Sequence, residues 1–245
     1  MDEVKRNIEI NQNEKVQKNF FNKSITIKSL LKIFIIILII LLIIIIGRKV
    51  IIIKQLQNKI GKYLDRTNYS ITVYTYYGNK FSYDECLVKD DNTYLYTTGL
   101  IDNEHNSKRI IFSNKEKMNL YLEMDGSKIA KLNQGEISSK MEIPNYLQTN
   151  DIKDFISLLF KAKITTLKCN GKECYEIRNI ENLDLVYTEN GYATVYIDKE
   201  TGLPERVVRS NTENKEDIVK DFSYEFDNVT EEDIKEPNVL EYEVK

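Results

Sequence analysis

The residue types that carry enzymatic chemistry are few and scattered in this chain. The only histidine is His105, which stands in a polar stretch beside Asn103, Glu104 and Asn106. A single imidazole cannot form a multi-histidine zinc site, and a Ser-His-Asp arrangement would depend on this one loop residue. The nine glycines are spread along the chain and form no phosphate-binding loop. We therefore expect no catalytic, metal-binding or cofactor-binding residues and no enzymatic activity.

The cysteines carry a second kind of chemistry. Cys169 and Cys174 flank Asn170-Gly171. If that dipeptide is a two-residue type I′ turn, the two cysteines are diagonal neighbours on one face. If residues 170–173 are all loop, they face each other with Cβ atoms about 4.5–5.5 Å apart. In both arrangements they are candidates for a disulfide, with two small core thiols as the alternative. Cys86 is expected to be a third, buried or free thiol.

One apolar stretch determines where the chain resides. Ile33 to Ile46 are fourteen consecutive Ile, Leu or Phe residues, and residues 30–47 form a span of about 18 residues that contains one charge, Lys32. As a helix this span is roughly 27 Å long, close to a bilayer core of about 30 Å. The stretch lacks a polar face, which disfavours a core helix of a soluble protein. It also lacks a small-x-small cleavage pattern and a closely following cysteine, so we expect an uncleaved signal-anchor.

The rest of the chain is organised around this span. We predict a polar cytoplasmic tail over 1–29, a transmembrane helix over 30–47 and an extracytoplasmic β-rich domain over 48–245. Lysines and arginines flank the span almost equally, so charge alone does not orient it. The large β-rich domain with its cysteine pair favours a location outside the cytoplasm for that domain. A net charge of −3 without a dominant basic segment argues against nucleic acid as a partner.

The pattern after the span predicts an α+β domain. Apolar residues recur at helical spacing over 48–64, which indicates either the first helix of the domain or a helix on the membrane surface. Strand-like alternation begins at Tyr69, with Asp125-Gly126 and Asn170-Gly171 as hairpin turns. Ile152, Phe155, Ile156 and Leu159 predict one further helix packed on the sheet. The sum is a single curved antiparallel sheet of eight to eleven strands, with one or two helices on one face.

Aromatic and aliphatic residues suggest what such a sheet could bind. All sixteen tyrosines follow the span. A curved sheet lined by Tyr, Leu, Ile and Met could hold an acyl chain or a peptide, and an ordinary sheet core is the alternative. Alternation along the strands gives four candidate groove residues: Leu120, Leu122, Tyr196 and Tyr224.

Two stretches give the chain a family resemblance. Residues 170–177, NGKECYEI, and residues 196–204, YIDKETGLP, follow a leading helix, hairpins and a mid-chain helix. This order resembles the bacterial lipoprotein-carrier (LolA/LolB-like) superfamily, which includes sensor domains of envelope-stress regulators. The resemblance covers about residues 50–245 and implies an open half-barrel that binds lipid or lipoprotein acyl chains. The uncleaved span departs from soluble carriers, and no motif transfers individual binding residues.

These observations lead to two hypotheses of different classes. The first is a single-pass membrane protein of the cell envelope whose extracytoplasmic domain binds a lipid, a lipopeptide or another hydrophobic component. The second is a non-catalytic docking or signalling subunit that binds an envelope protein. An apolar lining on the sheet favours the first, whereas a filled core and a long exposed edge strand favour the second.

Overall fold

The structure is a computed structural model that describes residues 27–101, 106–134, 140–149, 151–180, 193–210 and 217–245. His105 and all but the last three residues of the predicted tail, 1–29, therefore lie outside the described residues. The chain divides into two compact units, Met1–Arg48 and Lys49–Lys245.

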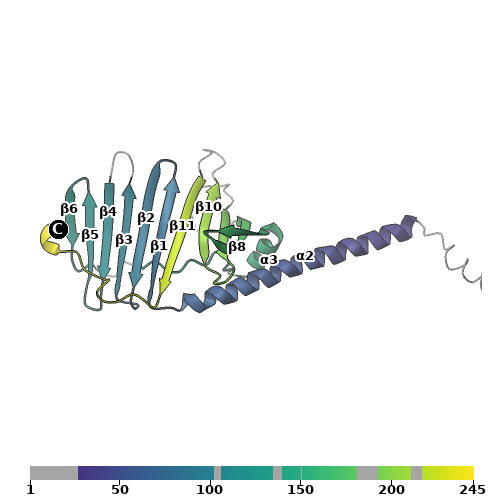
Figure 1. Ribbon diagram of the computed structural model, residues 1–245, viewed down its shortest axis with the longest axis horizontal. Coiled ribbons are helices and arrows are strands. Elements are labelled where there is room, and N and C mark those ends of the chain that lie inside the picture. The colour runs from purple at the N-terminus through teal and green to yellow at the C-terminus, as the bar shows by residue number, and fades with distance from the viewer. Residues whose placement is uncertain (1–26, 102–105, 135–139, 150, 181–192, 211–216) are drawn as a thin grey trace, which may run out of the picture. The chain divides into compact units, whose positions relative to one another are not determined.

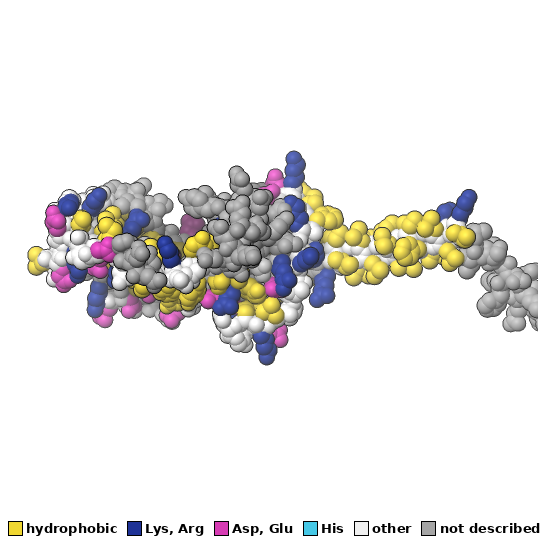
Figure 2. Space-filling model, turned by 90° about the horizontal axis from the view of Figure 1, so that it is seen from above, with side chains coloured by type: hydrophobic (Ala, Val, Ile, Leu, Met, Phe, Trp, Pro, Cys, Tyr) yellow, Lys and Arg dark blue, Asp and Glu magenta, His cyan; other side chains and the backbone are white. Residues whose placement is uncertain are grey.

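The described part of the first unit is helical. It is the start of α2 (Ile27–Leu64), which contains the predicted span. Between Ile33 and Ile45 the side chains are exposed and apolar, and Figure 2 shows this stretch covered by hydrophobic side chains on the side in view. Among the described residues, α2 is the one helix long and apolar enough to cross a membrane.

The second unit is built on one twelve-stranded sheet (Figure 1). Its spatial order is β12-β6-β5-β4-β3-β2-β1-β11-β10-β9-β8-β7. The strands are β1 (Tyr69–Tyr77), β2 (Lys80–Val88), β3 (Tyr94–Ile101), β4 (Asn106–Ser113), β5 (Met118–Met124), β6 (Ser127–Lys131), β7 (Lys163–Cys169), β8 (Lys172–Ile180), β9 (Ala193–Asp198), β10 (Pro204–Ser210), β11 (Asp217–Phe226) and β12 (Glu243–Val244). All neighbours pair antiparallel except β12, which adds two residues parallel to β6. The predicted α+β class with a large open sheet is confirmed.

Local turn chemistry explains the hairpins. Asp125-Gly126 and Asn170-Gly171 have positive φ at both positions, 48° and 86° in the first and 49° and 82° in the second. These values belong to type I′ turns, whose twist matches that of the flanking strands. The sequence prediction of both turns is confirmed, and the two-residue alternative applies at Asn170-Gly171.

The second half of α2 fills one face of the sheet, which we call the helix-bearing face. Ile52, Leu56 and Ile60 on α2 are buried, and they join the core cluster that includes Ile71 and Cys86. The segment 140–148 extends this cover, and Gln57 on α2 donates a hydrogen bond to the carbonyl of Leu147 at 2.7 Å. The Lys49–Leu64 part of α2 thus packs on the sheet, which agrees with the first of the two alternatives for residues 48–64.

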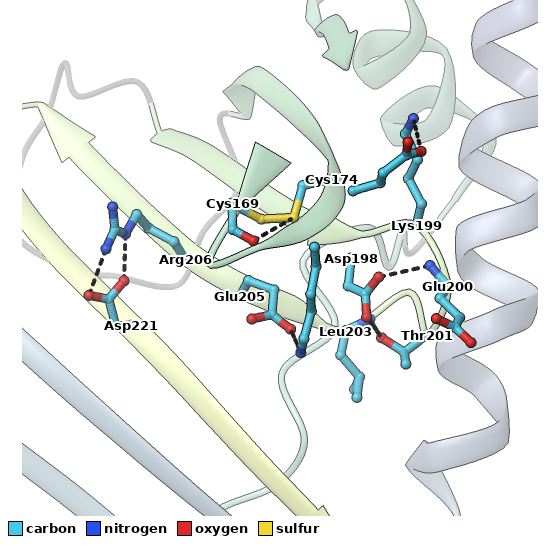
Figure 3. The surroundings of a disulfide bond; sticks show 12 residues. Cys169, Cys174, Asp198, Lys199, Glu200, Thr201, Leu203, Glu205, Arg206 and Asp221 are labelled. Atoms are coloured by element: carbon cyan, nitrogen blue, oxygen red, sulfur yellow. Dashed lines mark hydrogen bonds and ion pairs between the residues drawn. A yellow bond between two sulfur atoms is a disulfide. The ribbon is translucent and has the colours of Figure 1, made fainter. Parts of the chain in front are cut away.

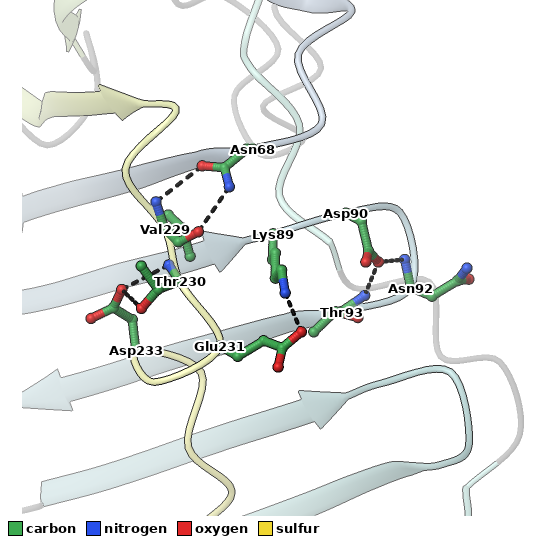
Figure 4. A network of polar contacts seen from close by, with 9 residues as sticks. All are labelled: Asn68, Lys89, Asp90, Asn92, Thr93, Val229, Thr230, Glu231 and Asp233. Atoms are coloured by element: carbon green, nitrogen blue, oxygen red, sulfur yellow. Dashed lines mark hydrogen bonds and ion pairs between the residues drawn. The ribbon is translucent and has the colours of Figure 1, made fainter.

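The opposite face, called the outer face, is covered by the C-terminal segment. Val229 and Ile234 pack on Phe112 and Tyr121, and η1 (Val239–Glu241) follows them. Asn68 exchanges two hydrogen bonds with the backbone of Val229, at 2.8 and 3.0 Å (Figure 4). Figure 4 also shows Lys89 paired with Glu231 and Thr230 bonded to Asp233. The sequence placed packed elements on one face only, whereas both faces are covered.

The predicted mid-chain helix exists as α3 (Ile152–Lys161), with Asp151 as its N-cap. It contacts the sheet at β8, where Leu158 packs against the core cluster, but only part of its predicted stripe is used. Leu159 is buried, but Ile152 and Ile156 are exposed, as is Phe160. Because α2 already fills the helix-bearing face, α3 lies at the β7–β8 end and contacts β8 and the start of the Lys49–Leu64 helix.

Candidate functional site

An apolar hollow in the described part of the second unit lies over β3 to β6, and we call it the β3–β6 hollow. It has a volume of about 250 Å³. Four of its lining residues are apolar: Leu100, Leu122, Met124 and Ile129. Polar and charged residues complete the lining: Thr98, Ser107, Lys108, Arg109, Glu123 and Ser127.

Strand register explains why these side chains meet. Residues directly opposite each other in paired strands project from the same face. One row runs across β3 to β6 through Thr98, Arg109, Leu122 and Ile129. The next row runs through Leu100, Ser107, Met124 and Ser127. Both rows lie on the helix-bearing face, because Thr98 pairs with Asp84, which shares its face with Cys86.

The hollow is open because the covering elements end before these rows. Nearer the centre of the same face, Met118 and Leu120 pack against the core cluster, to which segment 140–148 contributes Ile143 and Leu147. Leu122 and Met124 continue the same alternation along β5, and Met124 is 61% exposed. The hollow is therefore a direct extension of the core surface that α2 and 140–148 leave uncovered.

Charge is arranged beside this apolar surface. Arg109 projects from the middle of the hollow's inner row. Nearby on the same face, the hydroxyl of Tyr96 donates a hydrogen bond to the carboxylate of Asp84 at 2.8 Å. Burial raises the pKa of Tyr96, and the neighbouring Asp84 carboxylate raises it further, so the phenol stays neutral. The described residues contain no group of three His, Cys, Asp or Glu side chains able to hold a metal ion.

The predicted groove residues fall into three environments. Leu122 lines the hollow, whereas Leu120 is one pair further inward and packs against the core. Tyr224 is on the helix-bearing face in a stack with Phe222 and Phe226, at ring-centroid distances of 6.2 and 6.3 Å. Tyr196 projects from the outer face, where its hydroxyl donates to Glu176 at 3.2 Å. Tyr196 therefore cannot share a groove with the other three.

The Tyr224 hydroxyl has an unusual environment. It is buried and has no hydrogen-bond partner among the described residues. Burial raises its pKa, so the phenol stays protonated. The hydroxyl belongs to the packed core between β11 and Tyr146, and we assign it no ligand.

The cysteine pair lies at the outer edge of the sheet, at the β7–β8 turn. Cys169 and Cys174 are diagonal neighbours, since Cys169 pairs with Lys172 and Cys174 with Leu167. Their Cα atoms are 6.0 Å apart and their sulfurs are joined (Figure 3). Cys86 is a free thiol in the core. Burial raises its pKa to about 11, which makes it unreactive near neutral pH.

Sequence reasoning missed most of the hollow. Met124 continues the alternation that gave Leu120 and Leu122, so the same pattern could have included it. Arg109 and Ile129 lie opposite Leu122 only because of the strand register, which the sequence does not state. Predicting Thr98 and Leu100 would also have required the register between β3 and β4.

Residues 196–204, one of the two stretches that carry the family resemblance, include the turn between β9 and β10. In residues 198–204, the carboxylate of Asp198 accepts hydrogen bonds from the backbone N–H of Glu200 at 2.8 Å and the hydroxyl of Thr201 at 2.9 Å (Figure 3). Gly202 adopts a φ of +78°, and a Cβ there would lie 2.7 Å from the carbonyl oxygen of Leu56 on α2. The turn therefore seats α2 against the sheet.

Comparisons with known proteins give matches among solved structures alone. No protein-family model and no curated protein matches the chain. A chain of the MucA/MucB complex from Pseudomonas aeruginosa matches with a TM-score of 0.36 and 11% identity, over 76% of this chain and 61% of its own length. MucB solved alone matches with a TM-score of 0.37 and 10% identity, over 75% of this chain and 62% of its own. This chain thus spans about three fifths of the MucB chains.

A LolA superfamily protein from Nitrosomonas europaea matches with a TM-score of 0.29 and 7% identity, over 75% of this chain and 97% of its own.

Proposed function

We propose that this protein is a membrane-anchored, non-catalytic binding protein of the cell envelope, and that its β3–β6 hollow takes the acyl chain of an anionic amphiphile. The observation that carries the proposal is the hollow itself, which is lined by four apolar side chains and by Arg109. Its volume of about 250 Å³ is below the roughly 300–1,000 Å³ of sites for drug-sized ligands. Such a site suits part of one acyl chain rather than a whole phospholipid.

The chemistry of the lining supports an anionic head group. Leu122 and Met124 provide apolar area without a hydrogen-bond donor. The guanidinium of Arg109 is always charged and offers several N–H donors that match a carboxylate or phosphate. Apolar surface holds the chain, and Arg109 orients the head group.

Membrane anchoring is supported by the apolar helix and by the exposure of its side chains. A surface of Ile, Leu and Phe of this length is stable in lipid and unstable in water. We place the second unit outside the cytoplasm, since a joined cysteine pair is typical of oxidising compartments.

A photoreactive palmitate, with a diazirine in its acyl chain, tests the site in the full chain reconstituted in vesicles. After irradiation we expect adducts on peptides of β5 and β6, in addition to adducts on the apolar part of α2 from bulk lipid. Met124→Glu places a carboxylate in the hollow at a largely exposed position, so it should fold and should lose the β5–β6 adducts. Leu240→Glu is the control, because Leu240 is 94% exposed outside the hollow.

The head group is tested separately. Arg109→Gln should weaken labelling by the photoreactive palmitate but leave labelling by the corresponding uncharged alcohol unchanged. Equal β5–β6 labelling in the wild type and Met124→Glu would overturn the proposed site.

A second function, docking of an envelope protein, is favoured by β7. Within the described part of the chain β7 pairs only with β8, so its other edge is available for strand addition. Lys163 and Lys168 on β7 are exposed and would discourage nonspecific pairing while favouring an acidic partner strand. Replacing Thr166 by proline should abolish such docking and leave palmitate labelling intact.

A further inference from the structure

Helix α3 presents an apolar stripe to solvent. Ile152, Ile156 and Phe160 are 78%, 47% and 63% exposed, and they are spaced four residues apart on one side of the helix. The other apolar side of α3 is used for packing, with Leu159 buried. Exposed aliphatic and aromatic residues in such a row mark a surface that is covered in the working protein.

Two contacts fix the direction of α3 within the second unit. The ammonium of Lys49 donates hydrogen bonds to the carbonyls of Leu159 and Ala162, at 2.8 and 2.6 Å. The ammonium of Lys54 lies 4.8 Å from the centre of the Phe155 ring. Thus the C-terminal end of α3 lies beside Lys49, and its middle lies beside Lys54. Moving from Lys49 to Lys54 and from Ala162 to Phe155 leads in the same direction, so α3 runs antiparallel to this part of α2.

The bond from Lys49 also has an electrostatic role. The last carbonyl groups of a helix lack partners within the helix and carry its negative pole. The Lys49 ammonium satisfies two carbonyls there, which ties the C-terminal end of α3 to the first residue of the second unit. That residue follows Gly47, the end of the predicted span, by two positions in a continuous helix.

Charge is distributed unevenly along α3. Asp151 and Asp154 are at its N-terminal end, with Lys153 between them. Lys161 and Lys163 are exposed at its C-terminal end. The basic end is therefore the one beside Lys49, and it suits the anionic surface of a bacterial membrane.

We propose that the C-terminal end of α3 inserts into the head-group and acyl boundary of the membrane that holds the chain's own apolar helix. Phe160 lies deepest, Ile156 lies one turn shallower, and Ile152 remains near the water. The bilayer is the partner of the stripe that the observations favour. The basic residues and Phe160 lie at the end of α3 that Lys49 contacts, and Lys49 follows the end of the predicted span by two residues. This inference rests on the membrane anchoring in the proposed function and is independent of the β3–β6 hollow.

The absence of tryptophan from the chain makes the test direct. Phe160→Trp, Ile156→Trp and Ile152→Trp each introduce a single tryptophan into the full chain. Each variant is reconstituted in vesicles of phosphatidylcholine and phosphatidylglycerol, with and without acyl chains brominated near their middle. Leu240→Trp is the matched control, since Leu240 is exposed at the far end of the sheet, in η1.

We expect a gradient of quenching. Phe160→Trp should show blue-shifted emission and the greatest loss of intensity in brominated vesicles, followed by Ile156→Trp. Ile152→Trp and Leu240→Trp should keep solvent-like emission and lose none. A chain retained by the vesicles through an alkaline wash, but with Phe160→Trp emission equal to that of Leu240→Trp, would overturn this inference alone. Release of the chain by the wash would overturn the anchoring and this inference together.

Discussion

Glu236 is one of the side chains that secure the C-terminal segment on the outer face. Its carboxylate accepts hydrogen bonds from Tyr121, at 2.5 Å, and from Asn119, and it pairs with Lys117. Burial disfavours the charged carboxylate, but these three donors outweigh burial and lower the pKa of Glu236 below its ordinary value of 4.5. A carboxylate with a lowered pKa stabilises the fold above about pH 4.5, and this contribution is lost as the pH falls through the lowered pKa.

We therefore predict that Glu236→Gln lowers the unfolding free energy by about 1–3 kcal/mol at neutral pH. The difference from the wild type should be full above pH 5 and should shrink below pH 4.5, as the pH falls through the lowered pKa and the wild-type carboxylate becomes protonated. Thermal unfolding of the detergent-solubilised chain at a series of pH values measures it. Glu232→Gln, an exposed residue of the same segment, is the control and should follow the wild type. A gap between Glu236→Gln and the wild type that is constant down to pH 3 would contradict the prediction.

Among the elements, the β9–β10 turn determines how firmly α2 is held. Gly202 has a φ of +78°, and a Cβ there would lie 2.7 Å from the Leu56 carbonyl oxygen and 2.9 Å from the Ile60 nitrogen. The Lys59 ammonium also donates to the carbonyl of Lys199 in the same turn. Gly202→Ala must therefore strain the backbone and push α2 outward.

We predict that Gly202→Ala costs more than the roughly 1–3 kcal/mol of left-handed strain alone. Gly126→Ala is the matched control, since Gly126 has a φ of +86° with no atom within 4 Å of the added Cβ. Denaturant midpoints of the two variants separate strain from the clash with α2. Equal losses in both variants would show that the turn does not hold the helix.

Local patterns predicted most elements, because their signals are local. Asn170-Gly171 and Asp125-Gly126 specify their hairpins by positive φ, and the alternation of Met118 to Met124 specifies β5. The exposed stripe of α3 and the C-terminal cover of the outer face were not predictable in this way. An apolar stripe predicts that one face of a helix is covered, but it does not distinguish cover by the sheet from cover by the membrane. Val229 and Ile234 lie in irregular segments with no periodicity to read.

At the scale of the whole molecule, the candidate site depends on which part of the sheet stays uncovered. That is decided by where α2 and segment 140–148 end, so no single strand carries the signal. Leu122 could be proposed from alternation within β5. Tyr196 and Tyr224 could not be placed relative to each other, because their faces depend on the register of β9, β10 and β11.

The orientation of the chain in the membrane can be measured by labelling introduced cysteines, because the three native cysteines should not react. Cys86 is buried, and Cys169 and Cys174 are joined, so none of them should react with a membrane-impermeant maleimide. Leu240→Cys adds a thiol at a position that is 94% exposed in the second unit, and Asn13→Cys adds one in the N-terminal polar segment. In spheroplasts of a bacterial host we expect labelling of Leu240→Cys at once and of Asn13→Cys only after permeabilisation. The reverse order would place the sheet in the cytoplasm, where an acyl ligand of the envelope could not reach the β3–β6 hollow and a disulfide would not persist.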